Sequence, residues 1–467
     1  MTVGTETEAH AAAVDTLRAS YAAIPPGQPV RLSKRTSNLF RPRAQAPTPG
    51  LDVSGLSDVL AVDPESGTAD VQGMCTYERL VDATLLHGLM PLVVPQLKTI
   101  TLGGAVSGLG IESSSFRSGL PHESVLEMDI VTGDGEIVTA TPDGPHADLF
   151  EAFPNSYGSL GYAVRLRIEL EQTRRYVGLR HLPYADLDEL TDVVGQICAE
   201  GAWLGEDVDF LDGVMFGPAE AYLTLGRWSD DVPRPGPSAP SDYTGQQIYY
   251  RSIRERSHDL LTARDYLWRW DTDWFWCSRT FGAQHPVARR LWPARYRRSD
   301  VYHRIVGWEN RYQVMARIDR RRGKPDRERV VQDVEIPLER TADFLRWFHT
   351  HVGMSPAWLC PLQLREPTGP GSATRWPLYP LSPRQVYVNV GFWGMVPIRP
   401  GRADGDVNKL IEVAVADHGG HKSLYSDSYY DEATFAEMYG GPTYRAVKDA
   451  YDPGHRLTDL YDKAVGR

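Results

Sequence analysis

The chain has 467 residues, of which 42% are hydrophobic and 24% are charged, and its formal net charge is -11. This length predicts about two to four folded units around large buried cores. The composition is close to that of globular proteins, which excludes a fibrous or wholly disordered chain. The negative charge argues against a nucleic-acid-binding protein, because such proteins carry an excess of basic residues.

We expect neither a membrane-spanning segment nor a metal site. No apolar stretch reaches the about 18 residues of a transmembrane helix, and the first residues, MTVGTETEAHAAAVD, lack the basic and apolar regions of a signal peptide. The four cysteines, Cys75, Cys198, Cys277 and Cys360, form no CxxC pair, which argues against a zinc ribbon or a redox pair. Scattered single thiols are typical of a reducing cytoplasm.

The first part of the chain predicts a helix followed by short strands. Residues 11–23 carry apolar side chains at helical spacing, and Pro25 and Pro26 end this helix. The pattern then predicts strands at 59–63 and 70–73 around a turn at 64–67, a helix at 77–86 capped by Gly88, strands at 125–132 and 137–140 around the turn Gly133–Gly135, and a strand at 164–171.

The pattern of the sequence changes near residue 172. From here it predicts a helix at 185–199, an exposed or disordered proline-rich loop at 229–242, an aromatic and arginine-rich stretch at 266–329, a strand at 330–337, a helix at 340–351, a strand at 385–390 and a helical tail at 432–465 that is interrupted at Asp452–Gly454.

The most informative segment is a glycine-rich run at 95–119, which begins with Pro95-Gln96-Leu97 and contains TLGGAVSGLGIESSSFRSG (Thr101–Gly119). Closely spaced glycines let the main chain approach a pyrophosphate and donate backbone N–H groups to it. The run is neither a Walker loop, because no Gly-Lys-Ser/Thr follows, nor a GxGxxG after a first strand. By spacing alone, a glycine-rich turn within a packed α+β domain explains it equally well.

The order of several short motifs resembles the flavoproteins of the vanillyl-alcohol oxidase and p-cresol methylhydroxylase superfamily. These motifs are Leu51–Gly55, Val71–Gly73, Gly88–Pro91, Leu102–Gly104, Gly108–Gly110, Gly119, Gly133–Gly135, Asp148–Phe150 and Gly158–Gly161. The resemblance implies an α+β fold, in which a two-part FAD-binding domain is joined to an α+β substrate (cap) domain with a mostly antiparallel sheet. We expect the FAD-binding domain at 1–172, the substrate domain at 173–415, and a C-terminal segment at 416–467 that returns to the flavin.

A closer resemblance covers nearly the whole chain. It links the chain to the delta-24 sterol reductase family (seladin/Diminuto) and to bacterial relatives that reduce methylene-branched acyl chains. The motifs that carry it are Thr36–Arg41 (TSNLFR), Leu102–Ser115, Val330–Asp333 (VVQD), Pro356–Pro361 (PAWLCP), Leu424–Tyr430 (LYSDSYY) and Phe435–Gly441 (FAEMYGG). The residues expected to contact FAD are Pro95, Gln96, Thr101, Leu102, Gly103, Gly104, Gly108, Gly110, Ile111, Glu112, Ser113 and Gly161.

Two departures from these families sharpen the expectation. Residues 24–60 contain no His or Cys that could bond to the flavin, so we expect non-covalent FAD. The N-terminal membrane segment of the eukaryotic sterol reductases has no counterpart here, which argues against integral membrane placement. Lys422 is a candidate contact for the flavin or for a nicotinamide phosphate, and a solvated surface lysine is the alternative.

The resemblance implies reduction of an isolated carbon–carbon double bond. One carbon is protonated to give a tertiary cation, which takes a hydride from reduced flavin, with NADPH as electron donor. Asp427 is a candidate acid that a strand would place on one face with Tyr425 and Tyr429, and Glu112 is another. The structural alternatives are a turn carboxylate for Asp427, core tyrosines for its neighbours, and an ion pair with Arg117 for Glu112.

The segment 266–276 (YLWRWDTDWFW) contains four tryptophans, Trp268, Trp270, Trp274 and Trp276. Many basic residues follow: Arg289, Arg290, Arg295, Arg297, Arg298, Arg317, Arg320, Arg321, Arg322, Lys324, Arg327 and Arg329. One interpretation is a membrane face for anionic phospholipids, and the other is a buried aromatic core beside a solvated basic loop. The basic loop could alternatively hold the phosphate of NADPH.

The leading hypothesis is an FAD-dependent, NADPH-using reductase of a methylene-branched acyl chain in a phospholipid. Arginine greatly outnumbers lysine, which is typical of a GC-rich bacterial genome, where sterol synthesis is rare. A methyltransferase that makes the methylene lipid would be the partner, and the enzyme would lie in the cytoplasm against the inner face of the membrane. The alternatives are a sterol side-chain delta-24 reductase, an FAD-dependent oxidase and a lipid-binding protein without flavin.

Overall fold

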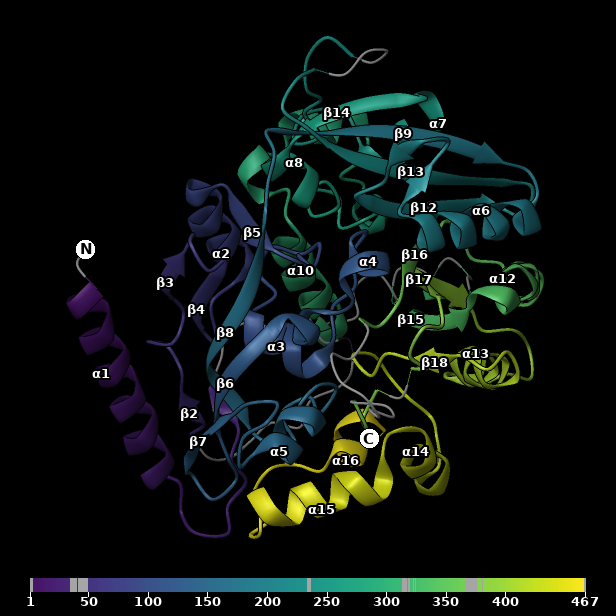
Figure 1. Cartoon of the computed structure of the whole chain (residues 1–467). Coiled ribbons are helices and arrows are strands. Elements are labelled where there is room, and N and C mark those ends of the chain that lie inside the picture. Colours follow the sequence, from purple (N-terminus) through teal and green to yellow (C-terminus); the bar gives the residue numbers. More distant parts are fainter. Residues whose placement is uncertain are drawn as a thin grey trace.

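Two antiparallel sheets with flanking helices carry the fold, which confirms the predicted α+β class (Figure 1). The computed structural model describes residues 3–33, 40, 49–232, 237–312, 317, 320–321, 323, 325–365, 376–379 and 381–465. Of the predicted loop at 229–242, residues 233–236 lie outside the described residues, and of the motif Thr36–Arg41 only Phe40 is described.

The smaller sheet has the strand order β3-β4-β8-β6-β7, with β5 beside β8. Its strands are β3 (Val59–Asp63), β4 (Thr68–Gln72), β5 (Leu89–Pro91), β6 (Val125–Val131), β7 (Ile137–Ala140) and β8 (Tyr162–Gln172). β8 lies at the centre, because its Leu166 pairs with Val71 of β4 and with Met128 of β6. The predicted strands and hairpins of this region are thereby confirmed.

Helices flank this sheet. They are α1 (Val3–Ala22), α2 (Tyr77–Thr84), α3 (Leu102–Gly108), α4 (Ser115–Ser118) and α5 (Ala147–Ala152), with a 3₁₀ turn at Leu85–His87. The turn ends at Gly88 with φ of 69°, as the predicted glycine cap requires. α1 packs through Leu17 against Leu51 and Leu56, next to the paired segments β1 (Leu32–Ser33) and β2 (Leu51–Asp52).

The larger sheet has the order β14-β9-β13-β12-β16-β17-β15-β18, and every pair in it is antiparallel. Its strands are β9 (Tyr176–Tyr184), β12 (Phe210–Gly217), β13 (Glu220–Ser229), β14 (His258–Thr262), β15 (Arg327–Pro337), β16 (Ala357–Leu362), β17 (Tyr387–Pro397) and β18 (His421–Lys422), and a separate small hairpin joins β10 (Ala202–Trp203) to β11 (Glu206–Asp207). A mostly antiparallel sheet in this part of the chain was predicted and is confirmed.

Three helices cover one face of the larger sheet, namely α6 (Leu187–Glu200), α12 (Leu338–His351) and α13 (Asp406–Asp417) (Figure 1). Strand β15 shows how the two faces differ. Val334 and Ile336 pack under these helices, whereas the alternating residues Asp333 and Glu335 point to the other face, towards the smaller sheet. Two carboxyl groups therefore lie on an inner face of the molecule.

The four tryptophans at 268–276 are buried, each with at most 6% of its surface exposed. They follow α8 (Ala263–Leu267), which comes after α7 (Tyr249–Glu255) and β14. The core interpretation of this segment is thereby confirmed, and the interpretation of these tryptophans as a membrane face is wrong. The reason is that the segment fills the space between the two sheets.

The prediction of a basic surface patch is also wrong in part, because several of its arginines make ion pairs or hydrogen bonds inside the protein. Arg289 pairs with Asp273 at 2.6 Å, Arg297 donates to backbone carbonyls, and Arg298 pairs with Glu78 at 2.7 Å. Exposed arginines remain: Arg290, Arg295, Arg304, Arg317, Arg320, Arg321 and Arg327. Arg322 and Lys324 lie outside the described residues.

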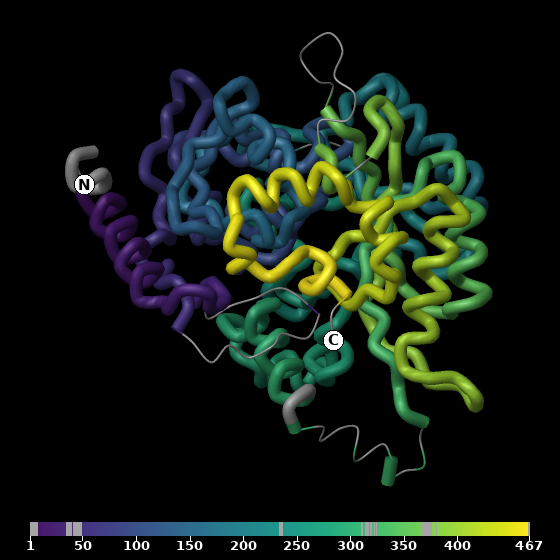
Figure 2. Tube along the Cα trace, turned by 90° about the horizontal axis from the view of Figure 1, so that it is seen from below, coloured from purple at the N-terminus to yellow at the C-terminus, as the bar shows by residue number. Residues whose placement is uncertain are grey.

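The C-terminal helices lie at the bottom of the molecule in Figure 1, and Figure 2 shows this side from below, with these helices in yellow. They are α14 (Glu432–Met438), α15 (Gly441–Tyr451) and α16 (Leu460–Ala464). Lys448 Nζ donates to the carbonyl of Ser159 at 2.7 Å, and the backbone N–H of Val30 donates to the carbonyl of Arg456 at 2.8 Å. Within the described part of the chain, no helix has the length and apolar character needed to span a membrane.

Candidate functional site

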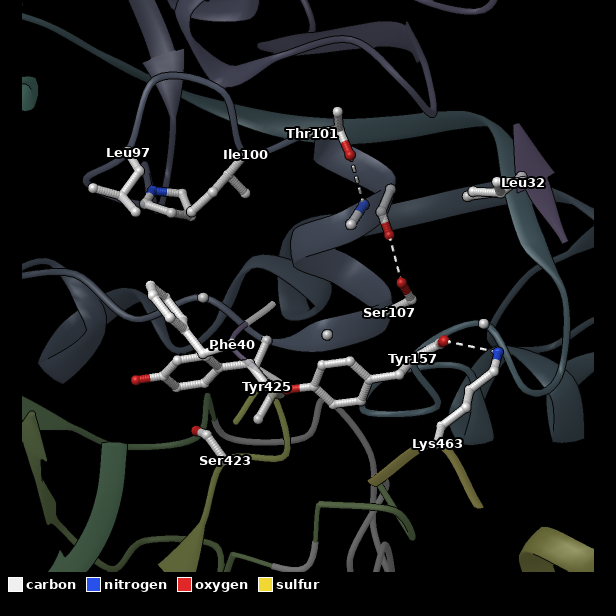
Figure 3. A pocket seen from close by; sticks show the side chains of 18 of the residues that line it. Leu32, Phe40, Leu97, Ile100, Thr101, Ser107, Tyr157, Ser423, Tyr425 and Lys463 are labelled. Carbon is white, nitrogen blue, oxygen red and sulfur yellow. Dashed lines mark hydrogen bonds between the residues drawn. The ribbon is translucent and has the colours of Figure 1, made fainter. Parts of the chain in front are cut away.

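A cavity of about 750 Å³ lies between α3, which flanks the smaller sheet, and the inner face of the larger sheet. Its volume is within the range of cofactor and substrate sites. Figure 3 shows Thr101, which precedes α3, and Ser107 of α3 on one side of it, and Phe40, Tyr425 and Ser423 on the other. Lys463 and Leu32 lie at one end in this view, so segments from both ends of the chain contribute to the walls.

The glycine-rich run forms the wall on the side of α3. Thr101 caps the helix by accepting from the N–H of Gly104, and the N–H of Gly103 donates to the carbonyl of Gly73. A Cβ atom on Gly103 would lie 2.7 Å from that carbonyl oxygen, and one on Gly110 would lie 2.7 Å from Pro95. These glycines therefore let the wall pack closely against the smaller sheet.

Most of the predicted FAD contacts lie at this cavity. Those that line it are Pro95, Gln96, Thr101, Gly103, Gly104, Gly108, Gly110 and Ile111. The structure does not bring the others to its surface: Leu102 packs in the core, Glu112 and Ser113 lie behind the wall, and Gly161 adjoins the lining residues Tyr162 and Ala163.

Lys422 is neither at the cavity nor on the surface. Its side chain is fully buried, and its Nζ contacts Glu412 at 2.6 Å and the carbonyl of Asp427 at 2.5 Å. The prediction of a phosphate contact by Lys422 is therefore wrong, and so is the alternative of a solvated lysine. Burial requires this cation to have a carboxylate partner, and Glu412 supplies it.

The strand predicted through Tyr425, Asp427 and Tyr429 is wrong, because β18 ends at Lys422 and the following segment has no strand partner. Tyr425 alone of the three lines the cavity. Asp427 instead accepts from Arg329 at 2.8 Å, and Tyr429 lies beside Gly405 and Lys409. The structure thus separates the three residues that the pattern grouped.

Glu112 is part of a buried ion cluster behind the cavity wall. Arg269 pairs with Glu112 at 2.7 Å and with Asp212 at 2.8 Å, and all three side chains are at most 3% exposed. The predicted partner Arg117 instead pairs with Glu171. Trp358, which lines the cavity, donates to Asp212 at 3.2 Å, so the cluster supports that wall.

Sequence reasoning missed Asp333 as a site residue. Asp333 lines the cavity and accepts from Asn389 Nδ2 at 2.9 Å, and its carboxyl interacts with the hydroxyl of Tyr425, which lines the same cavity. Trp393 in turn donates to Tyr425 Oη at 2.9 Å. Desolvation by the surrounding protein raises the pKa of Asp333 to about 6. The alternation of carboxyl and apolar residues in the predicted strand at 330–337 could have identified Asp333 from the sequence.

A second carboxyl–hydroxyl pair lies beside the first. Ser423 lines the cavity and donates its hydroxyl to Glu335 at 2.9 Å. Burial, and the nearby charge of Asp333, raise the pKa of Glu335 well above its usual value. Both effects favour the neutral form of the Glu335 carboxyl.

Aromatic rings complete the wall near these groups. Phe40 stacks on Trp274 with ring centroids 5.5 Å apart, and Phe275 lies 4.3 Å from Trp393. Trp274 and Phe275 adopt positive φ angles of 45° and 58°, which bulky residues rarely do. Such strain is concentrated at functional sites, and aromatic faces suit an apolar ligand or a developing cation.

The residues present fit a flavin dinucleotide. Close packing at Gly103 and Gly110 exposes main chain on one wall, charged groups such as Arg31 and Lys463 line the end near the chain termini, and planar aromatic rings line the other end. Backbone and cations can hold a pyrophosphate, and a flat apolar space can hold a flavin ring.

Comparison with known proteins agrees with this fit. Residues 7–141 match the model of an FAD binding domain. The chain is 24% identical to a Delta(24)-sterol reductase homolog of Caenorhabditis elegans, over 87% of this chain and 77% of that protein. It is 25% identical to the Delta(24)-sterol reductase of Arabidopsis thaliana, over 89% and 76%. Cytokinin dehydrogenase 10 of Oryza sativa is 32% identical over 40% and 35%.

These findings confirm the prediction of an α+β fold with an FAD-binding domain. The chain is an α+β FAD flavoprotein, an FAD-dependent oxidoreductase whose sequence is similar to Delta(24)-sterol reductases over most of its length.

Proposed function

We propose that the protein is an NADPH-using reductase of a carbon–carbon double bond in a lipid. The observation that carries this proposal is the cavity. Opposite the glycine-rich run, it has an aromatic wall and two carboxyl–hydroxyl pairs, Asp333 with Tyr425 and Glu335 with Ser423. The relatives named above are sterol reductases, which supports the same reaction class. In this proposal residues 1–172 form the FAD-binding unit, residues 173–415 the substrate unit, and residues 416–467 the returning segment.

Bound FAD would supply a hydride donor, and the chain would supply position and protons. Thr101, Gly104 and Gly108 would contact the cofactor, whereas Phe40 and Trp274 would exclude water from the double bond. A dry site matters because a carbocation would otherwise be captured by water. The same aromatic faces would stabilise that cation until the hydride is transferred.

We infer two candidate substrates, since each gives a tertiary cation on protonation. The first is a methylene-branched acyl chain of a phospholipid, which the arginine-rich composition favours because it is typical of bacteria with GC-rich genomes. A methyltransferase would then supply the methylene lipid. The second is a sterol side-chain alkene, which the names of the relatives favour.

Anaerobic reduction tests this function. NADPH should bleach the flavin absorbance of the purified protein, and air should restore it slowly. Addition of methylene-branched phospholipid should restore it quickly, and mass spectra should show a lipid heavier by two hydrogen atoms. If a sterol side-chain alkene restores the absorbance quickly and the methylene-branched phospholipid does not, the sterol is the substrate. Rapid release of peroxide in air would support an oxidase, and a protein without flavin absorbance would contradict both redox functions.

We further propose that an anionic membrane surface binds the outer faces of α9 (Pro286–Leu291) and α10 (Ser299–Tyr312). On α10, Arg304, Trp308 and Tyr312 recur every four residues and are exposed, while Tyr302 is buried and His303 contacts the cavity-lining Trp274. This helix would thus join the membrane to the cavity wall.

Liposome sedimentation tests this surface. Exchanging both Leu291 and Trp308 for serine should weaken binding to phosphatidylglycerol vesicles about tenfold or more, because each exposed apolar side chain would otherwise bury in the interface. Leu204→Ser is the matched control, since Leu204 is 71% and Leu291 77% exposed. Equal binding by the double variant and the parent would rule out this surface, as would equal binding to neutral vesicles.

A further inference from the structure

The inner face of β15 and the segment after β18 form a compact polar group at the cavity. Asp333 lies on β15, and the backbone N–H of Ser423 donates to the carbonyl of Asp333 at 3.1 Å. Tyr425 follows two residues further along, and it lines the same cavity as Asp333, where its hydroxyl interacts with the Asp333 carboxyl. Main-chain pairing thus fixes where the backbones of the two residues lie.

Two further donors hold this pair in place. Asn389, on the neighbouring strand β17, donates to Asp333 Oδ1 at 2.9 Å, and Trp393 on the same strand donates to Tyr425 Oη at 2.9 Å. All four residues line the cavity. The aromatic wall of Phe275, Trp358 and Trp393 surrounds the same region.

We propose that Asp333, acting through the hydroxyl of Tyr425, is the acid that protonates the substrate double bond; this assignment rests on the proposed function. The Tyr425 O–H bond breaks as a C–H bond forms from the π electrons of the alkene, and the Asp333 proton moves to the tyrosine oxygen. Reduced flavin, if bound in the cavity, would supply the hydride that completes the reduction, and a dihydronicotinamide would supply its electrons. Asp333 is left as a carboxylate and regains a proton from solvent.

The surroundings of Asp333 suit this role. Burial raises its pKa to about 6, so a useful fraction is protonated near neutral pH, and Tyr425 has a raised pKa that keeps its hydroxyl neutral. The titratable groups near Asp333 are Glu335 on the same strand, Cys360 on β16, Tyr379 and Tyr425. Burial raises the pKa of each of these groups, which favours their uncharged forms and so disfavours negative charge around Asp333.

The test separates the two halves of the reaction in the FAD-loaded protein. Asp333→Asn should leave the anaerobic bleaching of the flavin by NADPH within about threefold of the parent, which checks folding and cofactor binding. It should slow the alkene-dependent recovery of flavin absorbance by about 10²–10⁴-fold, the usual contribution of an acid. Tyr425→Phe, which keeps the ring, should also slow that recovery with little change in KM.

The pH profile distinguishes a proton donor from a structural residue. For the parent, the alkene-dependent rate should fall as pH rises through about 6, because Asp333 loses its proton, and Asp333→Asn should lose this dependence. Asp427→Asn is the comparison, since Asp427 pairs with Arg329 away from the cavity and should keep the parent rate and profile.

Three outcomes would overturn the assignment. One is recovery at the parent rate in both Asp333→Asn and Tyr425→Phe. Another is loss of recovery in Asp427→Asn while Asp333→Asn is unaffected. The last is a parent protein that bleaches with NADPH but recovers with no alkene, which overturns the proposed function as well, and the parent measurement alone reveals it.

Discussion

Replacing Arg269 with methionine should lower the free energy of unfolding at pH 7.5 by about 3–5 kcal/mol. Arg269 is fully buried between Glu112 and Asp212, and a methionine would leave two carboxylates without a cation in the interior. Burial already raises the pKa of Asp212 against the effect of Arg269, so removal of the cation should raise it further. Urea unfolding monitored by tryptophan fluorescence measures the loss.

The sign of the pH dependence follows from this shift. A carboxyl whose pKa is higher in the folded than in the unfolded protein binds protons on folding, so stability increases as pH falls through the raised pKa. The deficit of Arg269→Met should therefore shrink between pH 7.5 and pH 5. Arg264→Met, which removes a half-exposed pair with Asp82, should cost only about 0–1 kcal/mol. A small loss for Arg269→Met, or one that does not change with pH, would contradict this account.

Gly103→Ala should weaken FAD binding by about ten- to a hundredfold. The added Cβ would meet the carbonyl oxygen of Gly73 at 2.7 Å and the Cβ of Ala163 at 3.2 Å, and the first of these is main chain that cannot rotate away. Overpacking of this kind costs about 1–3 kcal/mol, and every 1.4 kcal/mol is tenfold in affinity. Because Gly103 lies in the wall of α3, the displaced helix would distort the cavity.

Flavin content after gel filtration, followed by titration of the stripped protein with FAD, measures this effect. Gly217→Ala is the control, because Gly217 ends β12 with no atom within 4 Å of an added Cβ and needs no left-handed conformation. It should bind FAD as the parent does. Normal flavin content in Gly103→Ala would contradict this prediction, because it would show that α3 can shift without weakening FAD binding.

Much of the smaller sheet was predictable because its strands are short, alternate in polarity and end at turn residues. In the larger sheet, the predicted strands correspond to β15 and β17, whereas β9, β12, β13, β14, β16 and β18 were missed. Strand β12 reads FLDGVMFG and is buried on both faces, so it shows no alternation, and Gly213 lowers its strand propensity. Strand β17 extends seven residues beyond the predicted end at Val390, through Gly391 and Gly394, because its pairing with β15 supports it.

At the site, local sequence identified the glycine-rich run and could not identify the pair Asp333 and Tyr425. The run is continuous in sequence, so its residues stay together in any fold. Asp333 and Tyr425 meet only because β18 pairs with β15, a contact that no local pattern predicts. The prediction that Asp427 and Tyr429 lie on one strand face with Tyr425 was wrong for the opposite reason. Their alternation was correct, but the segment leaves the sheet before they occur, so they face Arg329 and Gly405 instead.

The walls of the cavity have a consequence for how the protein is made. Arg31 and Leu32 line it together with Thr458 and Lys463, which follow them by more than four hundred positions. A ribosome releases the N-terminal segment first, and early segments fold while later ones are still being synthesised. The smaller sheet can therefore form early, but one wall of the cavity cannot exist until the last residues have emerged. A cofactor that needs this wall can be bound tightly only by the finished chain, so loading follows synthesis and cannot guide its first steps.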